Sequence, residues 1–450
     1  MNIKSLDTPR LIGRLSLLGA MSLAGTAQAA GAFDPQSPWA SGDWGGARTE
    51  LLDKGYDFSL EYVGEVGSNL DGGYNDDTTA RYSDQFALGV KMDLEKILGW
   101  NDAEFKLAIT ERSGRNISND RIGDPRAGTL SSSQEVWGRG QTWRLTQMWI
   151  KQAYFDGKLD VKAGRFGPGE EFNSFPCDFQ NLAFCGSQVG NWVGNVWYNW
   201  PVSQWALRVK YNITPEFFAQ VGVFEQNPSY LETGNGFKLS GSGTKGALLP
   251  VEVVWTPKFN GLPGEYRLGY YYSTANADDV YKGVNGEPQG ADGAGYKSHS
   301  SKHGGWIVAQ QQITTHNGDA SRGLNVFANA TVHDKDTNFV DNYQQVGLVY
   351  NGPFDARPKD AIGFGVARIH VNDDAQKNRR LINSQNGVDD YDNPAYLPIQ
   401  DTEYNAELYY GFHVTNWLTV RPNVQYIKHP GGVNQVDDAV VAGLKIQSKF

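Results

Sequence analysis

The sequence predicts an all-β fold: a transmembrane antiparallel β-barrel of sixteen strands, with long extracellular loops and short periplasmic turns. Three observations support this. The chain opens with an export signal, short segments alternate apolar and polar residues, and the composition combines 53 Gly, 22 Tyr, 21 Phe and 13 Trp with a mean hydropathy of −0.49. A barrel strand shows only half of its side chains to lipid, so this fold needs no long apolar run.

Residues 1–29 are expected to be a secretory signal peptide. Basic residues precede an apolar run at 15–24, and Ala27-Gln28-Ala29 matches an A-x-A cleavage site. A membrane helix is the alternative, but Gly, Thr and Gln interrupt the uncharged run. No later segment approaches the roughly 20 consecutive apolar residues of a spanning helix. Export without a membrane helix, together with the strand pattern, places the protein in the outer membrane of a Gram-negative cell.

The rest of the chain divides into an N-terminal periplasmic segment, 30–55, and a barrel domain, 56–450. In the first, Ala47 to Lys54 is expected to form a short helix closed by Gly55. In the second, period-2 alternation predicts strands near 56–67, 80–93, 102–112, 143–155, 158–165, 203–212, 215–226, 247–257, 264–275, 303–315, 323–334, 341–351, 359–372, 401–415, 417–428 and 437–450.

The last predicted strand shows the alternation most clearly. Lys445 lies on its polar face, and its apolar face carries Val440, Ala442, Leu444, Ile446 and the terminal Phe450. A terminal aromatic residue in phase with the apolar face is typical of strands that barrel-assembly machinery recognises. Phe450 is therefore the predicted assembly signal.

Long and short connections alternate along the predicted strands. The long ones are rich in Gly, Asn, Asp and Ser and lie at 68–79, 113–142, 166–202, 227–246, 276–302 and 373–400. Long outer loops and short periplasmic turns are expected when both chain ends are periplasmic, which also requires an even strand count. The connection 335–340 is short for an outer loop.

Cys177 and Cys185 are the only cysteines. In an exported protein they are expected to form a disulfide, and two buried free thiols are the alternative. Their spacing is not that of a usual zinc pair and no His lies nearby, so neither a metal nor any cofactor is predicted.

Composition and motifs argue against several function classes. A net charge of −10 disfavours a general nucleic-acid binder. None of the seven His residues falls in H-E-x-x-H or a similar motif, so an enzyme is not expected. An anion or phosphate pore would need a ladder of lysines along the strands, and none is evident.

Two motifs resemble those of the OprB family of carbohydrate-selective porins. One is Ser41-Gly42-Asp43-Trp44-Gly45-Gly46-Ala47-Arg48-Thr49, and the other is Lys162-Ala163-Gly164-Arg165-Phe166 followed by Glu170-Glu171-Phe172. The resemblance extends from Trp39 to Phe450. It implies a sixteen-stranded outer-membrane barrel that passes glucose and related monosaccharides by facilitated diffusion, and the paired cysteines look like those of the pseudomonad members.

The connection 166–202 is the candidate selectivity element. A sixteen-stranded barrel leaves an aqueous channel, so selectivity requires something folded into the lumen. This connection is the longest and contains both cysteines. We expect it to fold inward, whereas a loop covering the outer mouth is the alternative. Its three tryptophans could stack on sugars or belong to an interfacial aromatic girdle: Trp192, Trp197 and Trp200. The girdle interpretation is preferred for Trp143, Trp149, Trp205, Trp255, Trp306 and Trp417.

Four charged residues are the candidate partners of sugar hydroxyls, because arginine donates in a fork and carboxylates accept. Arg112 lies opposite the apolar face of its strand, and Arg144 alternates with apolar neighbours, so both are expected to point into the lumen. Arg165 is in phase with an apolar face and points inward only if a bulge intervenes. Glu135 is expected to hold an arginine in place. For each, an ordinary charge of the hydrated wall is the alternative.

The combined prediction is a passive pore for glucose and related monosaccharides with an Arg, Glu and aromatic constriction. A nonspecific diffusion pore for small hydrophilic solutes is the alternative. Expected partners are monosaccharides, outer-membrane lipid and lipopolysaccharide, and the barrel-assembly machinery. A monomer and a homotrimer are both compatible with the sequence.

Overall fold

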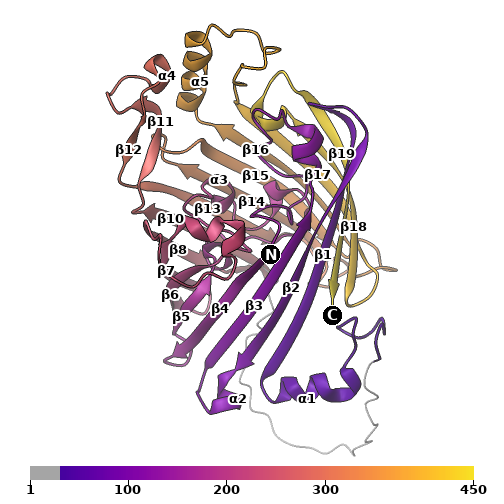
Figure 1. Cartoon of the computed structure of the whole chain (residues 1–450). Helices are drawn as coiled ribbons and strands as arrows, with labels where there is room; N and C mark the ends of the chain where they lie inside the picture. Colours follow the sequence, from indigo (N-terminus) through magenta and orange to yellow (C-terminus); the bar gives the residue numbers. More distant parts are fainter. Residues whose placement is uncertain (1–30) are drawn as a thin grey trace, which may run out of the picture.

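The structure is a computed structural model that describes residues 31–450, and the signal peptide predicted at 1–29 lies outside them. Successive wall strands pair antiparallel, and the first and last, β1 and β19, pair with each other. The sheet therefore closes into a barrel (Figure 1). Of its 17 strands, the two-residue β9 only extends a turn, so sixteen strands form the wall, as predicted.

The wall strands are β1 (Tyr56–Gly73), β2 (Thr79–Asp93), β3 (Ala103–Gly114), β4 (Trp143–Tyr154), β5 (Leu159–Phe166), β6 (Gln204–Thr214), β7 (Phe217–Gln226), β8 (Gly246–Trp255), β10 (Leu262–Ser273), β13 (Lys302–Gln312), β14 (Gly323–His333), β15 (Val340–Asn351), β16 (Ala361–Val371), β17 (Thr402–His413), β18 (Leu418–Lys428) and β19 (Asp437–Lys449). The strand β9 is Lys258–Phe259. The largest difference from prediction is β1, which runs on to Gly73. Its outer half contains Gly and polar residues, so apolar alternation does not mark it.

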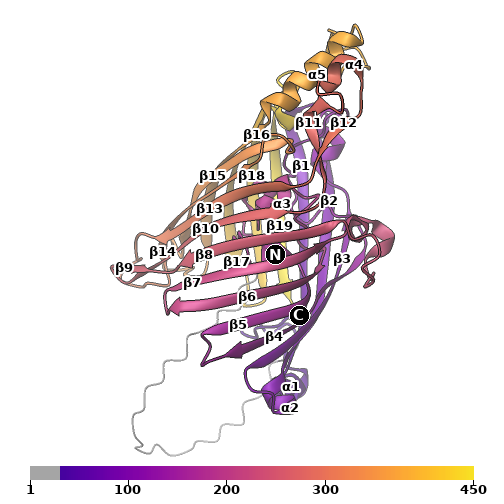
Figure 2. The same ribbon diagram turned by 90° about the vertical axis from the view of Figure 1, so that its left-hand side faces the viewer.

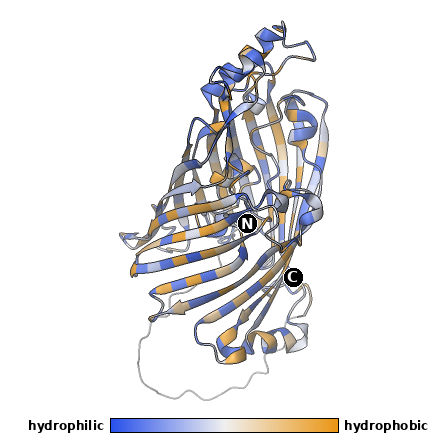
Figure 3. Ribbon diagram, turned by 60° about the vertical axis from the view of Figure 1, so that its left-hand side comes forward, coloured by the Kyte–Doolittle hydropathy of each residue, from blue (hydrophilic) through white to orange (hydrophobic). Residues whose placement is uncertain are grey.

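The wall is apolar outside and polar inside because side chains alternate along each strand. On β2, for example, Phe86 and Leu88 are exposed on the outer face, whereas Ser83 and Gln85 are buried on the inner face. Blocks of opposite hydropathy follow one another along the strands in Figure 3. This arrangement suits lipid on one side and an aqueous lumen with folded loops on the other.

Outer loops carry additional structure that the alternation pattern does not predict. The connection 276–302 holds the hairpin β11 (Ala277–Gly283) and β12 (Tyr296–His299) with α4 (Gln289–Asp292), and α5 (Asp373–Gln385) lies in the connection 373–400. They project beyond one end of the barrel, and α1 (Ala47–Asp53) and α2 (Leu94–Leu98) lie at the other (Figure 2). A solvated loop helix such as α5 has no wide apolar stripe to reveal it.

The remaining short helices are α3 (Val189–Trp192), η1 (Trp44–Gly46), η2 (Ser118–Ile122), η3 (Pro168–Glu170), η4 (Leu182–Phe184), η5 (Pro228–Leu231), η6 (Thr233–Asn235) and η7 (Pro430–Gly432). Among the described residues, no helix combines the length and the apolar character needed to cross a bilayer.

The N-terminal segment fastens the end of the barrel that carries α1. The predicted helix is present as α1, and Gly55 follows it with a φ of 99°. The Arg48 guanidinium lies between the rings of Trp39 and Trp44, 3.9 and 5.0 Å from their centroids. The Ala40 amide donates to the Lys449 carbonyl at 2.7 Å. The segment therefore contacts the last wall strand next to the closing seam.

The connection 167–203 folds into the lumen, as predicted. Its Phe172, Phe179 and Phe184 are buried and belong to the main apolar cluster. The Phe179 ring contacts the wall residues Phe327 and Tyr409, with centroid distances of 5.8 and 4.9 Å. The loop is therefore packed against the inner wall and narrows the pore.

Candidate functional site

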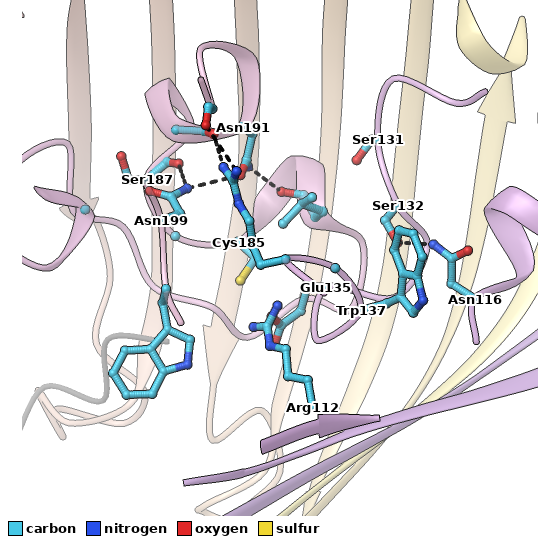
Figure 4. A pocket seen from close by; sticks show the side chains of 18 of the residues that line it. Arg112, Asn116, Ser131, Ser132, Glu135, Trp137, Cys185, Ser187, Asn191 and Asn199 are labelled. Carbon is cyan, nitrogen blue, oxygen red and sulfur yellow. Dashed lines mark hydrogen bonds between the residues drawn. The ribbon is translucent and has the colours of Figure 1, made fainter. Parts of the chain in front are cut away.

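Two inward loops, 115–142 and 167–203, enclose a cavity of about 370 Å³ beside the inner face of β3 (Figure 4). Its lining is mixed in character. It combines the cations Arg112 and Arg139, the acids Glu135 and Glu170, the indoles Trp137 and Trp200, and the amides and hydroxyls Asn116, Asn119, Asn191, Asn199, Ser131, Ser132 and Ser187. Three of the seven predicted substrate residues, Arg112, Glu135 and Trp200, meet here.

Arg112 projects from β3 into this cavity, on the face that its alternation predicts. Its Nε donates to Oε1 of Gln85 at 2.8 Å, which fixes the plane of the guanidinium. The residue is 5% exposed, and among the described residues its two terminal nitrogens make no hydrogen bond. They are therefore available as a forked donor pair for a solute.

Glu135 lies beside Arg112 in a buried charged cluster. Its Oε1 accepts from Nζ of Lys445 at 3.0 Å, and the same Nζ lies 3.4 Å from Oε1 of Glu65. The direct ion pair of Glu135 is with Lys445, and Arg112 acts on it as a second nearby positive charge. Burial opposes ionisation, but the charges of Lys445 and Arg112 hold the pKa of Glu135 below its usual value. From the sequence, Lys445 could be placed only on the polar face of the last strand.

Arg139 is a cavity residue that the sequence analysis did not single out. It has a positive φ of 63°, and its terminal nitrogens donate to the carbonyls of Gly194 and Gly190 at 3.1 and 3.2 Å. Burial lowers the pKa of Arg139 to about 10, which leaves it charged at neutral pH. No pattern in the sequence marks a single loop arginine of this kind.

Glu170 and Glu171 fix the start of the inward loop. Glu170 Oε2 accepts from Nε2 of Gln147 at 2.6 Å and lies 3.3 Å from Nζ of Lys162. Glu171 lies 2.8 Å from the same Nζ and 3.2 Å from Nε of Arg208. Burial opposes ionisation of Glu171, yet these cations hold its pKa well below the usual value. Only Glu170 lines the cavity.

The three loop tryptophans have different surroundings. Trp200 lines the cavity, and its Nε1 donates to the same Gln85 oxygen that holds Arg112, at 2.9 Å. Trp192 packs against Tyr343 with centroids 5.1 Å apart. Trp197 is fully buried and contacts Trp306 edge to face. Trp197 exposes no face to a solute and packs in the apolar cluster instead. Trp137 is a cavity indole that the sequence analysis did not single out.

Arg144 and Arg165 do not line the cavity. The Arg144 guanidinium donates to four loop carbonyls, those of Arg139, Tyr230, Leu231 and Glu232. Arg144 therefore holds these loops together, away from the lining of the cavity.

Arg165 stays on the outward phase of β5, because the strand pairs with both neighbours without a register shift. The bulge that would turn it inward does not occur. It is covered by an outer loop, where it donates to the Lys238 carbonyl at 2.7 Å and stacks on Tyr230 at 4.2 Å. Arg165 is therefore not among the residues that the structure brings to the cavity.

Carboxylates of the wall hold the inward loops by their backbone amides. Glu407 accepts from the amides of Gln180 and Asn181 at 2.8 and 2.7 Å. Glu252 accepts from the amide of Asn173 at 2.9 Å, and Glu403 from that of Leu130 at 2.8 Å. A disulfide joins Cys177 and Cys185 within the larger loop.

Two tryptophans expected in the interfacial girdle lie inside the barrel. Trp149 and Trp306 are 8% and 2% exposed and belong to the apolar cluster that holds the inward loop. By contrast, Trp143, Trp205 and Trp255 are exposed on the outer face, as a girdle requires. Alternation alone does not separate the two groups, because a large ring suits either lipid or a packed loop.

Comparisons with known proteins agree with this architecture. Residues 77–450 match the family model described as "Carbohydrate-selective porin, OprB family". The chain is 72% identical over 451 residues to Porin B of Pseudomonas aeruginosa, covering 100% of this chain and 99% of that protein. It is 45% identical over 446 residues to the putative porin QuiX of Acinetobacter baylyi, covering 97% and 99%.

Solved structures give the same result. The high-pH structure of Pseudomonas putida OprB superposes with a TM-score of 0.93 at 79% identity, covering 93% of this chain and 100% of that one. The low-pH structure of the same protein gives 0.59 at 55% identity, covering 92% and 99%. The chain is thus a channel of the outer membrane and not an enzyme, and it belongs to the OprB family of carbohydrate-selective porins.

Proposed function

We propose that this porin selects glucose and related monosaccharides at the cavity between its inward loops. The observation that supports this most directly is the lining, where Arg112 and Arg139 supply donors, Glu135 and Glu170 supply acceptors, and Trp137 and Trp200 supply aromatic surface. Sugars present hydroxyls that need both donors and acceptors, and flat C–H faces that suit an indole.

The arrangement also suits a solute that binds weakly and passes through the pore. The cavity lies inside the barrel between the two inward loops, and a permeating solute must bind weakly enough to leave. Here Arg112 is held by Gln85 and Glu135 by Lys445, so each offers only part of its hydrogen-bonding capacity to a solute. Diffusion through such a site needs no cofactor and no energy source.

Swelling of liposomes that contain the purified protein tests this proposal. We expect faster swelling in isotonic glucose than in a neutral amino acid of similar size, and slow swelling in a disaccharide. Losing hydrogen bonds to a charged group costs about 1.5–3 kcal/mol, so Arg112→Ala should lower the glucose rate about tenfold or more. Arg115→Ala is the matched control, because the Arg115 side chain is 71% exposed and does not line the cavity.

Rates that follow solute size alone would replace the proposal with a general diffusion pore. An unchanged glucose rate in Arg112→Ala would remove this residue from the site even if the channel prefers glucose.

The remaining partners are proposals of the same kind. Phe450 follows β19, and its amide donates to the Leu60 carbonyl of β1 at 2.8 Å, so the terminal residue lies at the closing seam. This position supports its role as the assembly signal read by the barrel-assembly machinery. Lipid and lipopolysaccharide are the expected surroundings of the apolar outer face.

A further inference from the structure

Basic side chains form a strip on the lumen wall across five neighbouring strands, β2 to β6. The sequence shows no lysine ladder within any one strand, but strand register creates one across strands. Lys91 lies directly opposite Lys106, Lys151 opposite Lys162, and Lys162 opposite Arg208. Like charges directly opposite each other destabilise a sheet. Three such pairs on one inner face indicate a use other than stability.

Among the described residues, four carboxylates form direct ion pairs with four of the six cations of the strip. Glu104 pairs with Lys91 and Lys151 at 3.2 and 2.9 Å. Glu170 and Glu171 pair with Lys162, and Asp160 and Glu171 pair with Arg208. Neighbouring β1 adds Asp57, opposite Lys91 in register, and Glu61, opposite Lys449.

Two lysines of the strip have no carboxylate within ion-pair distance among the described residues. They are Lys106 on β3 and Lys210 on β6. Both are half-buried, so their charge is partly removed from water. Lys106 faces Lys91 and Trp149 across the ladder, and Lys210 faces Asp160, which already binds Arg208. Glu170 and Glu61 lie within electrostatic range of Lys106, and Asp160 and Glu171 within range of Lys210, but none of them forms a direct ion pair with these lysines. A partly desolvated cation without a direct ion pair can still bind an anion from the lumen.

The strip adjoins the cavity through Glu170, which lines the cavity and lies 3.3 Å from Nζ of Lys162. We infer that the strip binds the carboxylate of acidic monosaccharides, such as uronates, as they pass. Their hydroxyls contact the cavity, and their carboxylate contacts either Lys106 or Lys210, which lie three strands apart. The channel then carries sugar acids in addition to neutral sugars. This inference rests on the pore and its cavity, and it does not require a preference for glucose.

Proteoliposome uptake of labelled D-glucuronate and D-glucose tests the inference, because these solutes differ by a carboxylate in place of a hydroxymethyl group. In the double variant Lys106→Gln/Lys210→Gln, we expect glucuronate uptake at low salt to fall about fivefold and glucose uptake to stay unchanged. Lys106→Arg/Lys210→Arg keeps both charges and should retain glucuronate uptake. High salt should reduce the wild-type glucuronate rate toward that of the Gln variant.

Lys158→Gln/Lys258→Gln is the matched control, since it removes two exposed lysines outside the lumen strip and should change neither rate. Equal glucuronate uptake in the wild type and the Lys106/Lys210 Gln variant would overturn the inference. Parallel loss of both sugars would also overturn it, because that result indicates a damaged pore. If the wild type takes up glucose no faster than a neutral amino acid, the proposed glucose selectivity is refuted. The comparison of glucuronate uptake between the wild type and the Lys106→Gln/Lys210→Gln variant still decides the present inference.

Discussion

At the scale of single residues, shared hydrogen-bond partners determine which side chains a solute can use. One oxygen of Gln85 holds both Arg112 and Trp200, so a donor fork and an aromatic ring are fixed relative to each other. Lys445 has the complementary role, because its Nζ lies near Glu135, Glu65 and the carbonyl of Phe179. Lys445 is fully buried and joins the wall strand β19 to both inward loops, 115–142 and 167–203.

Lys445→Met should destabilise the protein. The change keeps most of the side-chain volume but leaves two buried carboxylates without their cation, which costs about 3–5 kcal/mol. Chemical unfolding in detergent, followed by tryptophan fluorescence, measures the free energy of unfolding. Lys449→Met is the control, because Lys449 is exposed. Equal free energies for the two variants would contradict this account of the cluster.

At the scale of elements, wall carboxylates on β8 and β17 decide where the inward loops lie. Glu407 lies on β17 and accepts hydrogen bonds from two consecutive loop amides, those of Gln180 and Asn181. One side chain therefore fixes the position of this part of the loop along the wall. The disulfide acts within the loop, and the carboxylates join the loop to the wall. Both restrain the loop that narrows the pore.

Glu407→Ala should widen the opening. It leaves two buried amides unpaired at about 1–3 kcal/mol each, so the loop should leave the wall for part of the time. We expect swelling in a disaccharide to accelerate relative to swelling in glucose. Glu216→Ala, in an exposed turn, should not change this ratio. An unchanged ratio in Glu407→Ala would show that packing alone holds the loop.

At the scale of the whole molecule, stability should depend on pH through the charges that join the loop to the wall. Glu171 ionises more readily in the folded state because Lys162 and Arg208 lie beside it, so its folded pKa lies below the unfolded value of about 4.3. Its contribution is therefore complete above that value and is lost as pH falls through the folded pKa.

Glu171→Gln should consequently lose stability at neutral pH and lose less on acidification than the wild type. Unfolding midpoints in detergent between about pH 3 and pH 7 measure this dependence. Glu216→Gln is the control and should follow the wild-type curve. Parallel curves for Glu171→Gln and the wild type would exclude Glu171 as a source of the acid dependence.

Much of the fold could be predicted from the sequence because lipid and water impose a strict period of two on the wall. Strand count, the inward loop and α1 all follow from local patterns. The site is less predictable, since Arg139 and Trp137 lie in loops without periodicity. Arg165 shows the opposite case: its strand phase correctly indicated an outward position, because no bulge turns it toward the lumen.

The inward loops are held at Glu252, Glu403 and Glu407 by bonds that no solute has to make or break. Passage of a solute is therefore not coupled to breaking these bonds. A passive opening of this kind has no preferred direction, and net flow follows the concentration difference and reverses with it. Retention of an imported sugar must then come from a later step that binds or consumes it in the periplasm.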